Sequence, residues 1–231
     1  MKSQDIKEVI KSSEQFFKEL LTDKNGRYRS WEHCYSAFMQ HKGNVLSDED
    51  VDYLCLHLAF YLASWGMYRG SSKLLQKDYK VHTIAVKELM KKEYLNLWAV
   101  RCEELQSTSD KLEKLFVLSS ELQRIYREFG VTPTVTPTDT LITKILMGTL
   151  GCVPAYDRYF IDGVKGKNGA HLAFNKNSIQ ELSKLYVENN STFEEWRKSI
   201  STDELEYPQM KVLDMCFWRL GYKLEIAQKN K

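Results

Sequence analysis

Residues 139–160 read DTLITKILMGTLGCVPAYDRYF and show the helical spacing of apolar residues that recurs along the chain. Apolar residues at three- and four-residue spacing predict a helix over about 139–150. The Gly-Cys-Val-Pro sequence after it predicts a turn, because glycine and proline end helices. A lone lysine, Lys144, lies on this apolar helix, and Asp157 stands where the next helix is expected to begin. One helix–turn–helix unit therefore places an amine and an acid close together.

The same helical spacing recurs along the chain, and prolines occur at only four positions. Both facts predict an all-α protein, an irregular helical fold of about ten helices. Ser47 and Thr138 are expected to cap helices, and Gly66 is expected to end one. The expected helices cover about 6–21, from 30 onward, 48–65, 83–92, 109–129, 139–150, 156–163, 178–190, 192–200 and 207–228.

The clearest linker is VTPTVTPTD at 131–139, whose prolines and β-branched residues favour extended backbone. It predicts an N-terminal helical lobe over 1–130, a linker or crossover at 131–138, and a C-terminal lobe over 139–231. The pattern leaves open whether these lobes are two domains or parts of one.

Composition sets limits on function. The 231 residues carry a formal net charge of +2, which is too near neutral to indicate nucleic acid from charge alone. The five cysteines include no C-x-x-C pair, so we expect reduced, mostly buried thiols in the cytoplasm and no zinc finger. The N-terminus lacks an apolar signal segment.

No pattern in the sequence indicates a membrane span, a cofactor or a metal. The longest uncharged stretch, 53–68, falls short of the ~20 apolar residues that a spanning helix needs. It is better explained as a buried core helix, in which His57 is expected to be a hydrogen-bonded core histidine. The five histidines show no metal-ligand spacing.

Lys144 and Asp157 are the candidate catalytic residues. A lysine desolvated on an apolar helix has a lowered pKa and can act as a nucleophile. A carboxylate at a helix N-terminus is favoured by the helix dipole. The structural alternative is that Asp157 only caps a helix, that the Lys144 side chain reaches solvent, and that Arg158 pairs with a surface acid.

The segment from Thr143-Lys144 to Val153-Pro154-Ala155-Tyr156-Asp157 resembles the helix-hairpin-helix DNA glycosylases, most of all the 8-oxoguanine-type members. The resemblance implies a Lys144 amine that forms a Schiff base with the sugar. It implies an Asp157 carboxylate that supports departure of a base flipped into a helical cleft. The family's Leu-Pro-Gly-Val-Gly-like hairpin is replaced here by Thr136-Pro137-Thr138-Asp139, so its grip on a DNA phosphate is not implied.

Two further segments combine glycines with cations. WGMYRGSSK at 65–73 and DGVKGKNGAH at 162–171 are candidates for phosphate contact, and we expect them to lie near one groove. The alternative is a capped turn for the first and a solvated loop for the second. Together with the helix start after Asp157, they supply the candidate binding residues Arg69, Ser71, Ser72, Arg158, Lys165 and Lys167.

Two functions from different classes therefore remain. One is a helical enzyme that acts on or binds DNA or RNA through a glycosylase-like cleft. Glycosylase chemistry needs an exposed lysine that faces the acid. The other function is a non-catalytic helical module that binds a protein partner or self-associates, and it would bury the stem of Lys144 and expose an apolar patch elsewhere.

Overall fold

The computed structural model describes residues 3–68, 73–128, 138–165 and 173–229, and within these ranges the chain is all-helical, as predicted. The described ranges contain ten α-helices, several short 3-10 turns and no strand. The helices are α1 Ser3–Thr22, α2 Ser30–His41, α3 Asp48–Ser64, α4 Thr83–Leu89, α5 Asp110–Glu128, α6 Asp139–Thr149, α7 Arg158–Lys165, α8 Lys176–Glu188, α9 Asn190–Ile200 and α10 Gln209–Lys229.

Local signals set three helix ends where the sequence predicts them, whereas the helix expected over 83–92 ends at Leu89 and the one expected over 156–163 covers Arg158–Lys165. Ser47 caps α3 in a reciprocal capping box with Asp50. The Thr138 side chain accepts a hydrogen bond from the backbone N–H of Leu141 and caps α6. Gly66, at φ +75°, ends the helical path after α3 because this left-handed conformation favours glycine.

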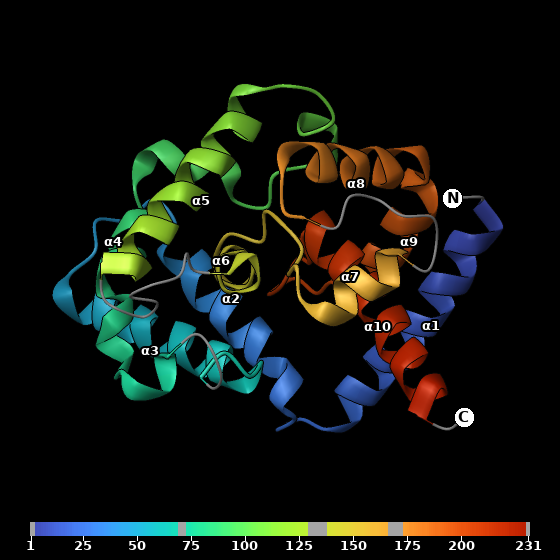
Figure 1. Ribbon diagram of the computed structural model, residues 1–231, viewed down its shortest axis with the longest axis horizontal. Coiled ribbons are helices and arrows are strands. Elements are labelled where there is room, and N and C mark those ends of the chain that lie inside the picture. The colour runs from blue at the N-terminus through green and yellow to red at the C-terminus, as the bar shows by residue number, and fades with distance from the viewer. Residues whose placement is uncertain (1–2, 69–72, 129–137, 166–172, 230–231) are drawn as a thin grey trace.

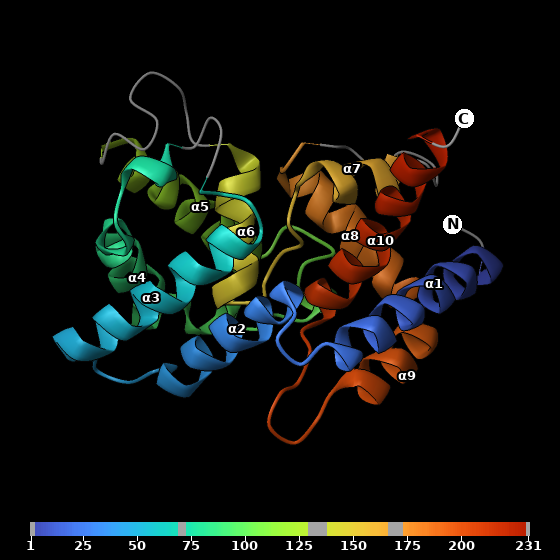
Figure 2. The same ribbon diagram turned by 90° about the horizontal axis from the view of Figure 1, so that it is seen from below.

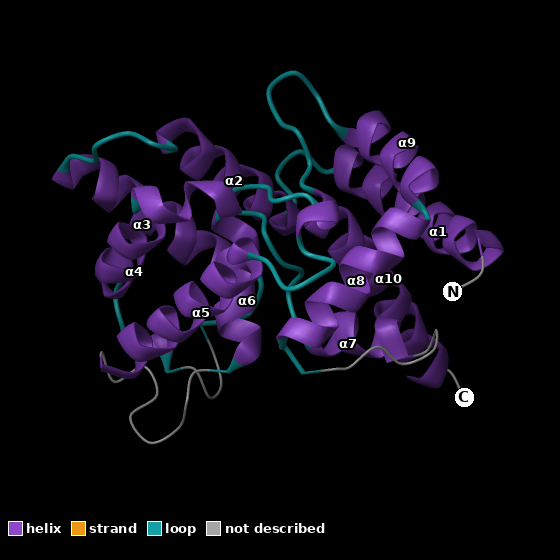
Figure 3. Cartoon of the chain, turned by 90° about the horizontal axis from the view of Figure 1, so that it is seen from above, coloured by secondary structure: helices purple, strands orange, loops and turns teal. Residues whose placement is uncertain are grey.

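The helices gather into two lobes, as Figures 1 and 2 show. Helices α2 to α6 pack together in one lobe, and α7 to α10 pack together in the other. The first helix joins the second lobe, because α1 lies against α10 and α9. In Figure 3 the loop between α9 and α10 extends away from the helices beside the junction of the lobes. Most of residues 131–138 lie outside the described ranges, so their role as a domain linker stays a prediction.

Helix α6 is the centre of the fold and appears end-on in the middle of Figure 1. Every residue of α6 from 141 to 149 is buried. The indole N–H of Trp31 on α2 donates to the backbone carbonyl of Met147 at 3.0 Å. A side chain at Gly148 would meet the Tyr61 ring of α3, so glycine allows α6 and α3 to approach closely. The lysine on α6 is thus held inside the protein.

Helices α7 and α10 are in direct backbone contact. A Cβ atom at Gly163 on α7 would lie 1.9 Å from the carbonyl oxygen of Phe217 on α10. A Cβ atom at Gly221 on α10 would lie 1.9 Å from the carbonyl oxygen of Tyr159 on α7. Only two facing glycines permit this approach. It fixes α7, and with it the helix start that carries Asp157, onto α10.

Candidate functional site

The turn between α6 and α7 is held by two threonines of α6. The Thr143 hydroxyl accepts a hydrogen bond from the backbone N–H of Tyr156 at 2.9 Å. The Thr140 hydroxyl donates to the carbonyl of the same residue at 2.8 Å. Because both backbone groups of Tyr156 are bonded to α6, the next residue, Asp157, is placed beside the helix that carries Lys144.

Asp157 uses its two carboxylate oxygens for two tasks. Oδ1 accepts the backbone N–H of Phe160 at 3.0 Å and so caps the start of α7. Oδ2 lies 2.8 Å from Nζ of Lys144. The side chains of Lys144 and Asp157 are 3% and 14% exposed. The amine therefore does not reach solvent but forms a buried ion pair with the acid. This differs from the solvent-reaching lysine of the structural alternative, and also from the exposed lysine expected of a glycosylase.

A second buried ion pair lies on α10 and was not predicted from the sequence. Lys211 Nζ is 3.0 Å from Oδ2 of Asp214, and both side chains are buried. Burial raises the pKa of the Asp214 carboxyl above its ordinary value, and the negative charge of Asp157 raises it further, while Lys211 lowers it. The available signal was two opposite charges, three residues apart, in the otherwise apolar sequence MKVLDMCFW.

One tryptophan ring joins the two pairs. Lys144 Nζ lies 5.0 Å and Lys211 Nζ lies 5.5 Å from the ring centroid of Trp65. Lys211 Nζ is also 4.9 Å from the ring of Trp31. An ammonium group is attracted to the face of an indole, so the rings help to hold both cations in a dry site.

The ion pairs border an aromatic cage, by which we mean the rings of Phe16, Tyr28, Trp31, Trp65 and Tyr207. These rings and Lys211 line a small cavity of about 20 Å³. Its walls come from α1, α2 and α10 and from three residues outside these helices: Tyr28 before α2, Trp65 directly after α3 and Tyr207 before α10. The cage is therefore built from both lobes. The free space matches about one water molecule, so the cage is closed in this form and a larger ligand would have to displace a ring.

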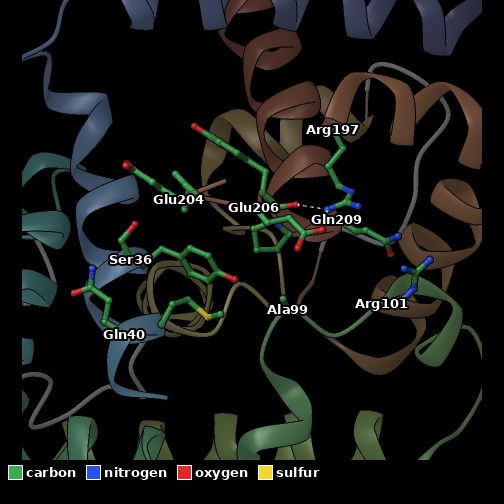
Figure 4. Close-up of a pocket in the computed structure, with 13 residues that line it drawn as sticks. Ser36, Gln40, Ala99, Arg101, Arg197, Glu204, Glu206 and Gln209 are labelled. Atoms are coloured by element: carbon green, nitrogen blue, oxygen red, sulfur yellow. Dashed lines mark hydrogen bonds and ion pairs between the residues drawn. The ribbon is translucent and has the colours of Figure 1, made fainter. Parts of the chain in front are cut away.

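A larger cavity of about 460 Å³ lies between α2, the 99–101 segment and the 204–209 loop, and Figure 4 shows its lining residues. Its two arginines are both paired with glutamates. Arg197 bonds to Glu206 at 2.6 Å, and Arg101 bonds to Glu103 at 3.0 Å. These cations are neutralised by the protein itself, so this cavity is a weaker candidate for binding an anionic ligand.

The predicted phosphate contacts are only partly within the described residues. Arg69, Ser71, Ser72 and Lys167 lie outside the described ranges. Arg158 is 65% exposed and its guanidinium pairs with Glu225 at 2.8 Å, while Lys165 is exposed at the end of α7. The shared groove predicted for 65–73 and 162–171 stays a prediction.

The core histidine is His82, and the expectation for His57 was wrong. His57 is half-buried and lies against the ring of Tyr53. His82 is fully buried, between the hydroxyls of Tyr68 at 2.8 Å and Tyr126 at 2.7 Å. Burial lowers the pKa of His82 to about 3, so the ring is neutral at physiological pH.

The described ranges hold neither a cluster of metal ligands nor a disulfide. All five cysteines are buried and unpaired. No group of three metal-ligating side chains occurs within the described ranges. No helix in this part of the chain is long and apolar enough to cross a bilayer. Comparison of the chain with protein-family models, curated proteins and solved structures found no match in any of the three.

Proposed function

We propose that this protein is a DNA N-glycosylase with lyase chemistry, in which Lys144 is the nucleophile and Asp157 is its partner. The observation that carries the proposal is the buried 2.8 Å contact between Lys144 Nζ and Asp157 Oδ2 at the start of α7. A desolvated lysine can act as a nucleophile once its ammonium has lost a proton, and the adjacent carboxylate can accept that proton. The resemblance of residues 143–157 to the 8-oxoguanine-type glycosylases adds the reaction class.

In this reaction the Lys144 amine bonds to the anomeric carbon of one nucleotide while the bond from that carbon to the base breaks. The base leaves with the bonding electrons and is protonated. Lys144 attacks only after its ammonium has lost a proton, and Asp157 Oδ2 is the acceptor within hydrogen-bond reach. The protonated Asp157 carboxyl then passes this proton to the departing base, and the carboxylate that this regenerates stabilises the positive charge on the sugar.

The aromatic cage supports a nucleic-acid substrate. A nucleotide that is cut at its glycosidic bond must leave the base stack, and flipped bases are held by stacking on aromatic side chains. Trp65 lies beside Lys144 and also lines the cage, so a base stacked there is near the amine. Because the free volume is small, entry of a base requires a ring such as Phe16 or Tyr28 to move.

The cell compartment and the partners belong to the same proposal. Five unpaired, buried cysteines suit a reducing compartment such as the cytoplasm. DNA is the expected partner, and RNA is the alternative nucleic acid.

Base release from short duplexes, each with one modified base such as 8-oxoguanine, uracil or hypoxanthine, tests the proposal. Wild-type protein is expected to release at least one of these bases, and Lys144→Met is expected to fall to background. Lys184→Met is the matched control, because Lys184 is exposed on α8 and pairs with Glu188 on the same helix. Since Lys144→Met leaves Asp157 buried without its cation, Lys144→Met/Asp157→Asn serves as a second, neutral variant. If wild type releases none of these bases, the glycosylase function is refuted. If wild type and both variants release a base equally, Lys144 is not the nucleophile.

The second candidate function is a non-catalytic module that self-associates. It is favoured by the burial of Lys144 and by an apolar stripe on α3, where Tyr53, Leu56 and Phe60 are exposed at helical spacing. Scattered exposed apolar residues are ordinary, whereas a continuous stripe is typical of an interface. Sedimentation of wild type against Leu56→Glu/Phe60→Glu tests this function: a wild-type dimer that the substitutions dissociate supports it, and a monomer in both cases excludes self-association through α3.

A further inference from the structure

The turn that carries Asp157 is also bonded to α10. Oδ1 of Asp214 accepts the backbone N–H of Ala155 at 3.0 Å. The backbone N–H of Asp157 in turn donates to the carbonyl of Ala155 at 2.8 Å. With the threonine contacts from α6, the backbone of 155–157 is held from both sides. Asp214 supplies the contact from the α10 side.

The cost of burying Asp214 is offset by Lys211. Asp214 is 2% exposed and Lys211 is 5% exposed. A buried carboxylate needs a cation and hydrogen bonds to satisfy its oxygens. Here each oxygen has one partner: Oδ1 has the Ala155 amide and Oδ2 has the Lys211 ammonium. The hydrogen bond from the Ala155 amide is also stronger to this carboxylate than to a neutral acceptor, because ionised acceptors form shorter and stronger hydrogen bonds.

We propose that Asp214 is a positioning residue: it holds the 155–157 turn so that the Asp157 carboxylate stays against the Lys144 amine, and Lys211 is its counter-ion. The catalytic part of this role rests on the proposed glycosylase function, whereas the placement of the ion pair does not. The competing explanation is that Lys211 and Asp214 only stabilise the packing of α10. In that case the free energy of unfolding and the acetylation rate of Lys144 would change together.

Two double variants separate these explanations. Lys211→Met/Asp214→Asn removes both charges but keeps a carbonyl oxygen that can accept from Ala155. Lys211→Met/Asp214→Leu removes both charges and the acceptor, with side chains of similar volume. Both are expected to fold, because buried ion pairs replaced by apolar groups of similar size often leave stability unchanged or raised. Global stability is followed by urea unfolding.

The first measurement needs no enzymatic activity. Amide hydrogen exchange at Ala155 and acetylation of Lys144 by an amine-reactive ester are measured under native conditions. In the leucine variant we expect both rates to be faster than in the asparagine variant by about 10- to 100-fold, the range expected when a buried N–H is left without an acceptor. Equal rates in the two variants would overturn the positioning role. So would rates that follow the urea stabilities alone.

The second measurement is borohydride trapping of an abasic-site duplex at several pH values. Both variants lack Lys211, which lines the cavity of the cage, so they are compared with each other. We expect the leucine variant to trap about 10-fold or more slowly than the asparagine variant, with equal duplex affinity in the two. Equal trapping by both variants would overturn the catalytic part of the role. Wild-type protein that fails to trap would refute the proposed glycosylase function, and the exchange and acetylation rates would still decide whether Asp214 places the ion pair.

Discussion

The contact between α7 and α10 makes Gly163→Ala the most informative single substitution for the architecture of the site. The added Cβ would lie 1.9 Å from the carbonyl oxygen of Phe217, about 1.5 Å short of ordinary van der Waals contact. The obstacle is backbone in the middle of α10, so no rotamer change relieves it and the two helices must separate. Overpacking of this kind costs roughly 3 kcal/mol, while alanine in a helix gains about 1 kcal/mol over glycine.

We therefore expect Gly163→Ala to lower the free energy of unfolding by about 2 kcal/mol, although alanine is the better helix former. Urea unfolding followed by far-UV circular dichroism measures the change. Gly43→Ala is the control, because Gly43 has φ +79° and no atom within 4 Å of an added Cβ, so only its backbone conformation resists the change, at about 1 kcal/mol. If Gly163→Ala is as stable as wild type, the close packing of α7 on α10 is wrong, and so is the placement of Asp157 that depends on it.

Further predictions concern the charged groups and the thiols. Asp157→Asn is expected to destabilise the fold by about 3 kcal/mol in urea unfolding, because Lys144 is left buried without its partner; a mere helix cap would cost only ~0.5–1 kcal/mol. His82 stays neutral when folded, with a pKa of about 3, but is protonated below its ordinary pKa of 6.5 when unfolded. Stability should therefore fall by roughly 1.4 kcal/mol per pH unit from about pH 6 towards pH 3, and His82→Gln should lack this component of the slope. Burial raises the pKa of the Cys152 and Cys216 thiols to about 12, so a disulfide reagent at neutral pH should modify them only at the rate of unfolding. Binding of a short DNA duplex should weaken steeply with salt, and salt-independent binding would count against phosphate contacts.

The fold was predictable where the signals are local. Ser47 and Thr138 hold side-chain oxygens at the expected capping positions, and Gly66 ends the helical path after α3, so these three boundaries follow from the sequence. The packing of α1 on α10 was not predictable, because apolar periodicity tells which face of a helix is buried but not which helix covers it.

The candidate site also has one part that local spacing predicts and another that depends on contacts between distant parts of the chain. Lys144 and Asp157 belong to one helix–turn–helix unit, so their contact could be predicted from short-range spacing. The contacts of Lys211 with Trp31 and Trp65 join distant parts of the chain, and no local rule pairs them. The same limit explains why His57 was predicted to be the core histidine, although His82 is the buried one. An apolar helix marks a histidine as a core candidate, but its burial depends on which elements pack against that helix.

Covalent trapping of Lys144 tests the central claim most directly. Wild-type protein is incubated with an abasic-site duplex and sodium borohydride, and the adduct is mapped by mass spectrometry of its peptides. Because an amine that attacks the sugar forms a reducible Schiff base, we expect one adduct, on Lys144, that is absent in Lys144→Met and retained in Lys184→Met. An adduct on another residue, or no adduct from a folded wild-type protein, would contradict the assignment of Lys144 as the nucleophile.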